Sequence, residues 1–256
     1  MELPRNHFKH ALMAGTQQLG LWCTLSSAYG IELLAGSGFD WLLIDTEHSP
    51  SELPAVMSQL QAVAPYPVTA VVRPAWNDPV LIKRYLDIGA QTLLLPYIQD
   101  EGDAEAAVRA MSYPLRGIRG VSALTRATRF GRIKHYAARC DEELCLLVQV
   151  ETVEAIERLE SIASVEGVHG VFIGPGDLAA SMGLLGKPGH PEVVEIVESA
   201  IARIIRCGKP AGILTSDRAL ARRCIDLGST FTAVGVDAGI LATETSRLAD
   251  SFRPPA

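Results

Sequence analysis

Short apolar runs alternate with longer amphipathic segments along almost the whole chain. The apolar runs are rich in Val, Ile and Leu and lack regular polar alternation, which is typical of parallel strands that are buried on both faces. We therefore expect strands over residues 18–23, 39–45, 69–73, 92–96, 144–150, 170–173, 210–214 and 231–236.

The segments between these runs repeat their apolar positions with the period of a helix. The sequence predicts helices over residues 29–35, 51–63, 78–88, 103–111, 153–163, 191–207, 217–227 and 238–251. Pro79 in the first turn and Gly89 after the last turn mark the bounds of one of them. Two stretches, 112–140 and 181–190, are expected to be irregular.

Strand and helix follow each other in eight units within 256 residues, which predicts a closed (β/α)₈ TIM barrel formed by a single domain over residues 1–256. A doubly wound open sheet is the alternative, and such sheets more often carry a nucleotide-binding fingerprint. Gly174-Pro175-Gly176 begins like GxGxxG, but Asp177 follows and the third glycine is missing. No nucleotide cofactor is expected.

Charge and cysteine content narrow the class of protein. The formal net charge is −6, which argues against binding to nucleic acid. The N-terminus lacks the apolar core of a signal peptide, and no run reaches the length of a membrane span. Five cysteines without a CxxC pair fit a reducing compartment, so we expect a soluble, cytoplasmic protein without a membrane partner.

One segment concentrates basic side chains. It is either a solvated loop or a local anion-binding or subunit-contact segment, and arginine suits both roles equally. Its members are Arg116, Arg119, Arg126, Arg129 and Arg132.

Polar side chains gather where the predicted strands end, whereas the strand starts are plain. In barrel enzymes the active site lies at the C-terminal ends of the strands, so this one-sided distribution indicates catalysis. The residues concerned are Asp45, Glu47, His48, Arg73, Gln149, Glu151 and Asp177.

Two of these carboxylates suit a metal. Glu151 and Asp177 end neighbouring strands, so they should converge at the mouth of the barrel. Carboxylates with open remaining positions suit a hard divalent cation such as Mg²⁺ or Mn²⁺, completed by water and substrate oxygens. Either residue alone could be a helix cap, but the pair at facing strand ends favours the metal.

Two other side chains could act on a substrate. His48 can transfer protons near neutral pH, although a lone histidine here is also compatible with a surface loop. Arg73 ends an apolar strand and would point into the mouth, where a buried guanidinium needs an anionic partner. That partner is Asp45, Glu47 or a substrate oxyanion.

Gln149 and Trp22 are further candidates for contact with substrate. Gln149 lies two residues before Glu151, so both face the same side of the strand, and the amide can donate to a bound oxygen. Trp22 ends the first strand and belongs either to the core or to the wall of the site.

The positions of the lysines argue against one mechanism. Aldolases that form a Schiff base need a lysine at the end of a barrel strand. The chain has five lysines, and none follows a predicted strand; Lys209 precedes the seventh strand. This distribution favours stabilisation of an enolate by a metal.

At these residues the sequence resembles the HpcH/HpaI aldolase family, and the matching stretches extend from about residue 8 to residue 252. They are GLWCTLSS, ELLAGSGFDWLLIDTEHSP, QLQAVAPYP, VVRPAWNDP, QTLLLPYIQ, GIRGVSALTRATRFGRI, LVQVET, GVFIGPGDLAASMG, HPEV and AVGVD.

The resemblance implies a barrel that binds a divalent cation (Mg²⁺, Mn²⁺ or Co²⁺) and cleaves a 4-hydroxy-2-oxo acid reversibly into pyruvate and an aldehyde. For 4-hydroxy-2-oxoheptane-1,7-dioate the aldehyde is succinate semialdehyde. The resemblance also implies a homo-hexamer in which the last helix is exchanged between subunits.

Roles for individual residues follow from the same resemblance. Glu151 and Asp177 would be the metal ligands, and Arg73 would bind and polarise the oxygen that becomes the enolate. Backbone N–H groups near Gly176 and Asp177 would hold the pyruvate carboxylate, as helix N-termini commonly do for anions.

The resemblance further implies that His48 assists proton transfer, either itself or through a metal-bound water. Asp45 and Asp87 would orient this histidine or balance its charge.

The chain departs from the family at three places. It has Thr46-Glu47-His48 where the family often reads GEH, Gly176 where the family reads GPAD, and a shorter loop after Gly120. These changes keep every predicted ligand, but they leave the aldehyde open.

Other functions compete with this one. A related lyase could act on a sugar-derived acid such as 2-dehydro-3-deoxyglucarate, or on a CoA thioester, although an acidic chain with no obvious phosphate patch weighs against the thioester. A non-catalytic barrel used as a scaffold is the third possibility, and the retained candidate residues weigh against it.

Overall fold

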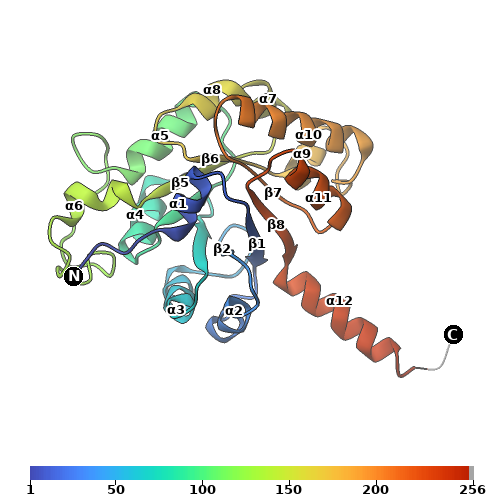
Figure 1. Cartoon of the computed structure of the whole chain (residues 1–256), viewed down its shortest axis with the longest axis horizontal. Coiled ribbons are helices and arrows are strands. Elements are labelled where there is room, and N and C mark those ends of the chain that lie inside the picture. Colours follow the sequence, from blue (N-terminus) through green and yellow to red (C-terminus); the bar gives the residue numbers. More distant parts are fainter. Residues whose placement is uncertain (254–256) are drawn as a thin grey trace.

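The computed structural model describes residues 1–253, so the last three residues of the expected domain 1–256 lie outside the described chain. It contains a closed barrel of parallel strands that follow one another in sequence order, with β8 pairing to β1 (Figure 1). The (β/α)₈ barrel is confirmed. The strands are β1 Gln18–Cys23, β2 Trp41–Asp45, β3 Thr69–Arg73, β4 Thr92–Leu95, β5 Cys145–Val150, β6 Gly170–Ile173, β7 Ala211–Leu214 and β8 Phe231–Val236.

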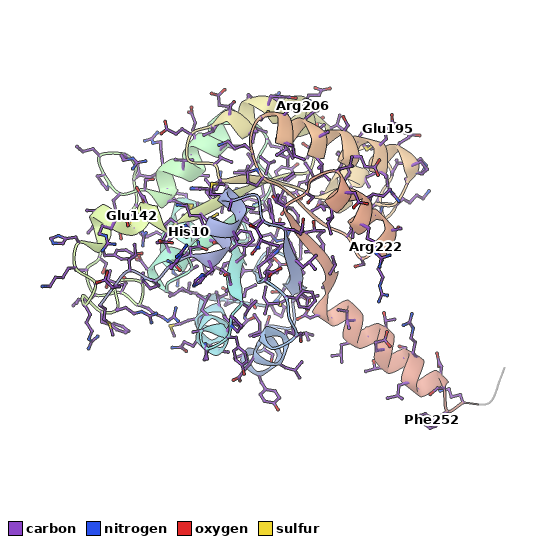
Figure 2. All side chains as sticks on the ribbon, in the orientation of Figure 1. His10, Glu142, Glu195, Arg206, Arg222 and Phe252 are labelled. Atoms are coloured by element: carbon purple, nitrogen blue, oxygen red, sulfur yellow. The ribbon has the colours of Figure 1, made fainter. Side chains whose placement is uncertain are left out.

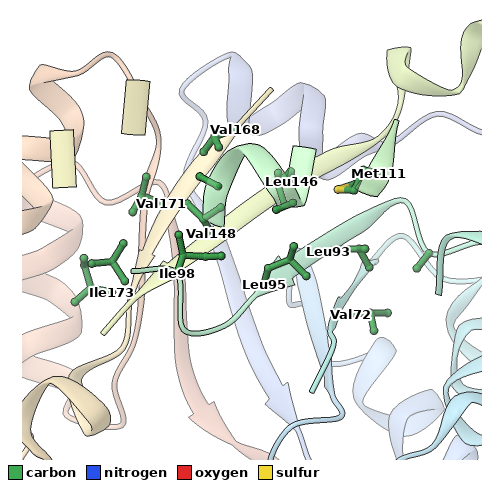
Figure 3. Packing of buried hydrophobic residues seen from close by; sticks show 14 of the residues in the cluster. Val72, Leu93, Leu95, Ile98, Met111, Leu146, Val148, Val168, Val171 and Ile173 are labelled. Carbon is green, nitrogen blue, oxygen red and sulfur yellow. The ribbon is translucent and has the colours of Figure 1, made fainter. Parts of the chain in front are cut away.

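Side chains of each strand alternate between the helices and the inside of the barrel. Figure 3 shows part of the outward set, which packs under the helices and includes Leu93 and Leu95 of β4. The inward set contains large rings, among them Trp22, Phe172 and Phe231. The barrel is therefore filled below its mouth by apolar side chains.

Most of the expected helices are present. The expected helix 153–163 is divided, because Arg158 leaves the helical path between α7 and α8. The helices are α1 His7–Met13, α2 Ala28–Ala35, α3 Leu53–Val63, α4 Pro79–Asp87, α5 Glu101–Met111, α6 Tyr136–Arg139, α7 Val153–Glu157, α8 Leu159–Ser164, α9 Pro175–Ser181, α10 Pro191–Arg206, α11 Arg218–Asp226 and α12 Asp237–Asp250, with the 3₁₀ turn Cys140–Glu142 after α6.

Helix α1 closes the barrel at the N-terminal ends of the strands. The sequence did not predict it, because it is short and lies outside the repeating units. Asn6 caps it by accepting a hydrogen bond from the Lys9 amide. Phe8 packs against Trp41 and Phe231, with ring centroids 5.7 and 6.0 Å apart. The closed end leaves the opposite end of the barrel as the place for a site.

Helix α12 extends away from the barrel instead of covering it (Figure 1). Its first turns contact β1 and β8, but Leu241 and Leu248 expose 54% and 62% of their surface. Phe252 lies beyond its far end (Figure 2). An exposed apolar helix that leaves its own barrel has a surface to bury against something else. No helix within residues 1–253 is both long and apolar enough to span a membrane.

Candidate active site

A buried ion pair stands at the ends of β2 and β3. Asp45 and Arg73 are partners in the strand register, so their side chains enter the mouth next to each other. Arg73 Nε donates to Asp45 Oδ1 at 2.9 Å and Nη2 donates to Oδ2 at 2.7 Å. This two-pronged contact fixes the plane of the guanidinium.

Trp22 supports the same pair from β1. Its indole N–H donates to Asp45 Oδ2 at 3.3 Å, and its ring lies 4.9 Å from Cζ of Arg73. On the other side the ring packs against Phe172, with centroids 5.5 Å apart. Trp22 is therefore a buried wall that positions Arg73, and its contact with substrate stays a prediction.

The Asp45 carboxyl stays ionised in this setting. Burial alone would raise its pKa, but the hydrogen bonds and the charge of Arg73 outweigh burial and hold the pKa below its ordinary value. The backbone N–H of Glu47 and the Trp22 indole act in the same direction. Asp45 thus acts on Arg73, and the structure places no contact between Asp45 and His48.

Glu47 and His48 follow β2 in the loop that leads to α3. Glu47 Oε2 lies 2.8 Å from Arg73 Nη1, although the two groups are not aligned for a hydrogen bond. His48 is largely exposed, with 65% of its side-chain surface accessible, and its Nε2 lies 3.8 Å from Glu47 Oε1. The imidazole is therefore free to exchange protons with solvent or with a bound molecule.

Glu151 is buried just after β5 and is held from two sides. The backbone N–H of Tyr97 donates to its Oε1 at 2.8 Å, and the Gln149 amide donates to Oε2. The other amide atom of Gln149, Oε1, is buried without a partner. A Cβ at Gly174 would lie 2.5 Å from Glu151 Oε2, so only glycine lets β6 end this close to the carboxylate.

The pKa of Glu151 is raised to about 7. Burial is the main cause, and the charges of Asp177 and Glu47 add to it, while the hydrogen bonds from Gln149 and Tyr97 lower the pKa and do not compensate. Burial also raises the pKa of Glu47, against the opposing effect of Arg73, and the charges of Asp45 and Asp177 add to it. The three carboxyl groups are thus close enough to repel one another.

Asp177 is exposed in the first turn of α9, the helix that begins directly after β6. Pro175 at the first helical position favours this helix. The Gly176 and Asp177 amides belong to the first turn, where N–H groups have no partner within the helix. A Cβ at Gly176 would meet nothing within 4 Å, so the space beside these amides is open.

The residues present fit a divalent cation. Glu151 and Asp177, with Glu47 nearby, give a site of converging carboxylates that repel one another, and a cation would offset this repulsion. Within residues 1–253 there is no cluster of three or more Asp, Glu, His or Cys side chains with the geometry of a metal site. The chain would therefore supply two carboxylates, and water and substrate would supply the other ligands.

Asp87 lies apart from these residues. It is the last residue of α4, and α4 runs from the mouth back to the N-terminal ends of the strands. There Arg119 Nη2 donates to Asp87 Oδ1 at 2.8 Å, and Arg119 is fully buried. Within one chain, the structure thus keeps Asp87 and His48 at opposite ends of the barrel.

The arginine segment lies at that same opposite end. Arg126 Nη1 donates to the Ile88 carbonyl at 2.7 Å, while Arg116 forms an exposed ion pair with Asp141. Arg126 and Arg129 line a cavity of about 660 Å³ together with Gln91. This cavity and the carboxylate cluster are therefore two different places.

Sequence reasoning underestimated two residues of the mouth. Glu47 was counted among the polar residues at the strand ends, but the only role given to it was that of a partner for Arg73. Tyr97 was not identified, because its contribution to the site is a backbone N–H that reaches Glu151. The polar residues that follow, Gln99, Asp100 and Glu101, do not indicate this backbone contact.

Comparison with known proteins gives the class that this fold and site define. The family described as HpcH/HpaI aldolase/citrate lyase matches residues 18–243. The chain belongs to this family, and it is a carbon–carbon lyase of the aldolase type.

Individual relatives cover nearly the whole chain. It is 64% identical to a pyruvate aldolase of Rhizobium etli over 252 residues, 98% of this chain and 99% of the relative. It is 55% identical to a 4-hydroxy-2-oxo-heptane-1,7-dioate aldolase of Shigella sonnei over 248 residues, 96% of this chain and 95% of the relative. A crystal structure of a HpcH/HpaI aldolase/citrate lyase family protein from Burkholderia cenocepacia superposes with a TM-score of 0.93 at 37% identity, covering 97% of this chain and 100% of that one.

Proposed function

We propose that this protein is a metal-dependent pyruvate aldolase that cleaves a 4-hydroxy-2-oxo acid reversibly into pyruvate and an aldehyde. The first substrate to consider is 4-hydroxy-2-oxoheptane-1,7-dioate, because relatives named for it are 55% identical. The observation that supports the proposal most is the arrangement of the mouth. A fixed guanidinium, Arg73, pairs with Asp45 and Glu47, and Glu151 lies near the charges of Glu47 and Asp177 without an ion pair of its own.

Glu151 and Asp177 would hold the divalent cation, which is Mg²⁺, Mn²⁺ or Co²⁺. When bound, the cation supplies Lewis-acid stabilisation of the negative charge that develops on the pyruvate half of the substrate. Gln149 orients Glu151 by donating to it, and its free buried Oε1 can take part in hydrogen bonding with a bound water or substrate. No lysine follows a strand, in keeping with this route rather than with an imine.

Arg73 would bind the 2-oxo oxygen. A guanidinium has five N–H groups, and the hydrogen bonds to Asp45 use two of them, which leaves three for other acceptors such as a substrate oxygen. Because Asp45 and Trp22 fix the guanidinium before substrate arrives, little reorganisation is needed as charge develops. The open first-turn amides of Gly176 and Asp177 suit the pyruvate carboxylate.

His48 would take the proton from the C4 hydroxyl and return it in the reverse reaction. Its exposure suits this role, because it can load and unload its proton from solvent. Oε1 of Glu47 lies 3.8 Å from Nε2 of the imidazole. Asp87 pairs with Arg119 and cannot contact His48 of its own chain. Its expected role, to orient the histidine, therefore requires an assembly in which Asp87 of another copy approaches the mouth.

We further propose a homo-hexamer in cytoplasm. The exposed apolar side chains of α12 support exchange of this helix between subunits, because a lone chain would leave them in water. All five cysteines are free, which fits a reducing compartment.

The function is tested by pyruvate release from 4-hydroxy-2-oxoheptane-1,7-dioate, coupled to lactate dehydrogenase. The protein is stripped with EDTA and then given Mg²⁺, Mn²⁺ or Co²⁺. We expect release only with metal, and a loss of at least about a hundredfold in Glu151→Ala and in Asp177→Ala. Glu154→Ala is the control, since this exposed carboxylate lies three residues beyond Glu151 on the outer helix α7. Undiminished release in EDTA, or trapping of a lysine adduct by borohydride, would overturn the proposal.

A further inference from the structure

Two exposed aromatic rings stack on each other at the rim of the barrel. The rings of Trp76 and Tyr97 lie 5.5 Å apart between centroids, with an angle of 28° between their planes. Trp76 exposes 53% of its surface and Tyr97 exposes 43%. Exposed aromatic pairs are costly to leave in water, and they commonly mark a place where something binds.

The pair belongs to the same mouth as the carboxylate cluster. Trp76 lies three residues beyond Arg73, and Tyr97 lies two residues beyond the end of β4. The backbone N–H of Tyr97 donates to Glu151 at 2.8 Å, so the residue that carries this ring is in direct contact with a proposed metal ligand. Tyr97 adopts a left-handed conformation with φ of 55°, which is unusual for an aromatic residue. In this conformation the Tyr97 amide contacts Glu151 while the Tyr97 ring remains exposed at the rim.

The charge of the mouth bears on what this pair would bind. In residues 1–253, the segments that join each strand to the next helix contain no lysine, and the arginine next to them, Arg73, is already held by two carboxylates. Lys187 and Arg218 lie outside these segments. The same segments contain the acidic residues Glu47, Glu52, Asp78, Asp100, Glu151 and Asp217. A carboxylate at the far end of an aldehyde would therefore meet like charges in these segments, and the segments themselves offer it no lysine or arginine.

We propose that the Trp76–Tyr97 pair is the subsite for the aldehyde, and that it selects uncharged aldehydes with an apolar or planar tail over succinate semialdehyde. This proposal rests on the proposed function, since it assigns the second reactant of that reaction. Pyruvate would occupy the groups around Arg73, Glu151 and Gly176. The tail of the aldehyde would then lie on the rings and remove apolar surface from water.

The test uses the whole protein with Mg²⁺ in the direction of aldol addition. Pyruvate is combined with benzaldehyde, pentanal or succinate semialdehyde, and kcat/KM is measured for each aldehyde. We expect the wild-type protein to favour benzaldehyde over succinate semialdehyde by roughly tenfold, in line with the selectivity of one apolar subsite. A preference for succinate semialdehyde would overturn the proposal, and it would indicate a cation supplied by a second copy.

Two variants remove one ring each. Tyr97→Asn keeps the backbone N–H to Glu151, and asparagine tolerates the left-handed conformation better than most residues. Trp76→Ser removes the other ring. In both, we expect kcat/KM for benzaldehyde to fall about tenfold, while the value for succinate semialdehyde falls far less. Tyr97→Phe retains the stacked pair and should retain the wild-type preference.

A second readout separates failure of this proposal from failure of the proposed function. Exchange of the pyruvate methyl protons in D₂O, followed by NMR, reports enolate formation without any aldehyde. Absence of exchange in the wild-type protein would contradict the proposed function itself. If exchange is present but the ring variants leave the ratio of benzaldehyde addition to exchange unaltered, the proposed subsite is wrong. A tenfold drop in that ratio is the expected result.

Discussion

At the scale of single residues, two buried carboxyl groups in one mouth have opposite properties. Asp45 has a lowered pKa, because Arg73 pairs with both of its oxygens and outweighs the effect of burial. Glu151 has a raised pKa, because burial and its acidic neighbours outweigh two hydrogen bonds. Asp45 is therefore a permanent anion that positions Arg73, whereas Glu151 lacks the positive charge that a bound cation would provide.

The raised pKa of Glu151 predicts how the stability of the metal-free protein depends on pH. Between the ordinary pKa of 4.5 and the folded value of about 7, the folded state binds more protons at this group than the unfolded state does. The free energy of unfolding must therefore decrease as pH rises through this range, and the contribution is lost above it. In EDTA we expect Tm to fall by a few degrees between pH 5 and pH 7.5.

Glu151→Gln is the matched variant for this measurement, because an amide of the same shape does not titrate. Its Tm should change much less over the same pH range. If the Tm of the metal-free wild-type protein does not fall over this pH range, the prediction is wrong. If the Tm of the variant falls by the same amount, Glu151 is not the group responsible. Metal affinity of the wild-type protein should increase with pH up to about 7, because protons compete with the cation for Glu151.

At the scale of elements, the turn from β6 into α9 determines how close two strand ends can approach. Gly174 joins β6 to α9 at a point where a Cβ would lie 2.5 Å from Oε2 and 2.9 Å from Cβ of Glu151. The Glu151 side chain is held by Tyr97 and Gln149, so it has little freedom to move away. The glycine is thus required by the position of the carboxylate.

We therefore expect Gly174→Ala to displace Glu151 and to weaken metal binding by about tenfold or more, as measured by isothermal titration calorimetry with Mn²⁺. Gly189→Ala is the control, since a Cβ there meets nothing within 4 Å and its backbone is not left-handed. Equal metal affinity in both variants would mean that the packing around Glu151 is looser than the structure shows.

Helix α12 leads to a second prediction at this scale. Leu241 and Leu248 lie seven residues apart, hence on one face of the helix, and both are exposed in the single chain. If this face is buried between subunits, Leu241→Asp combined with Leu248→Asp should convert the assembly to a smaller species. Light scattering coupled to size-exclusion chromatography measures the mass. Arg247→Ala is the control, because its exposed ion pair with Glu244 is within its own helix. An unchanged mass in the double variant would contradict the exchange of this helix.

The sequence predicted the barrel well, because buried parallel strands leave a strong apolar signal and their order is fixed by the repeating units. The strand bounds agree within a few residues, as for β1 and β3. Helices α1, α6 and α9 escaped prediction because they are short, and α6 lies within the stretch 112–140 that was expected to be irregular. The pairing of Asp45 with Arg73 could be anticipated from neighbouring strand ends, but their two-pronged geometry could not.

Other parts of the candidate site could not be obtained from the sequence. The Tyr97 contact is made by a backbone N–H, which no residue type reveals. The place of Asp87 depends on which end of α4 it occupies, and the pairing with Arg119 joins residues 32 positions apart. The stacked pair of Trp76 and Tyr97 joins two different loops in the same way.

At the scale of the whole molecule, the parts form a barrel that is closed at one end and polar at the other. Helix α1 and the inward rings exclude water from the interior below the mouth. The carboxylates and Arg73 then stand above this apolar floor, where electrostatic interactions are stronger than in water. The proposed chemistry therefore takes place at the mouth of the barrel.

The most direct measurement is exchange of the pyruvate methyl protons for deuterium, because it needs neither the aldehyde nor a knowledge of which aldehyde is used. The rate is followed by NMR in the EDTA-treated protein, after addition of Mn²⁺ or Mg²⁺, and in Asp177→Ala. The account predicts exchange that appears with metal and is lost in the variant. Exchange that proceeds equally in EDTA, or that survives in Asp177→Ala, would contradict the claim that this carboxylate cluster forms the metal-dependent site.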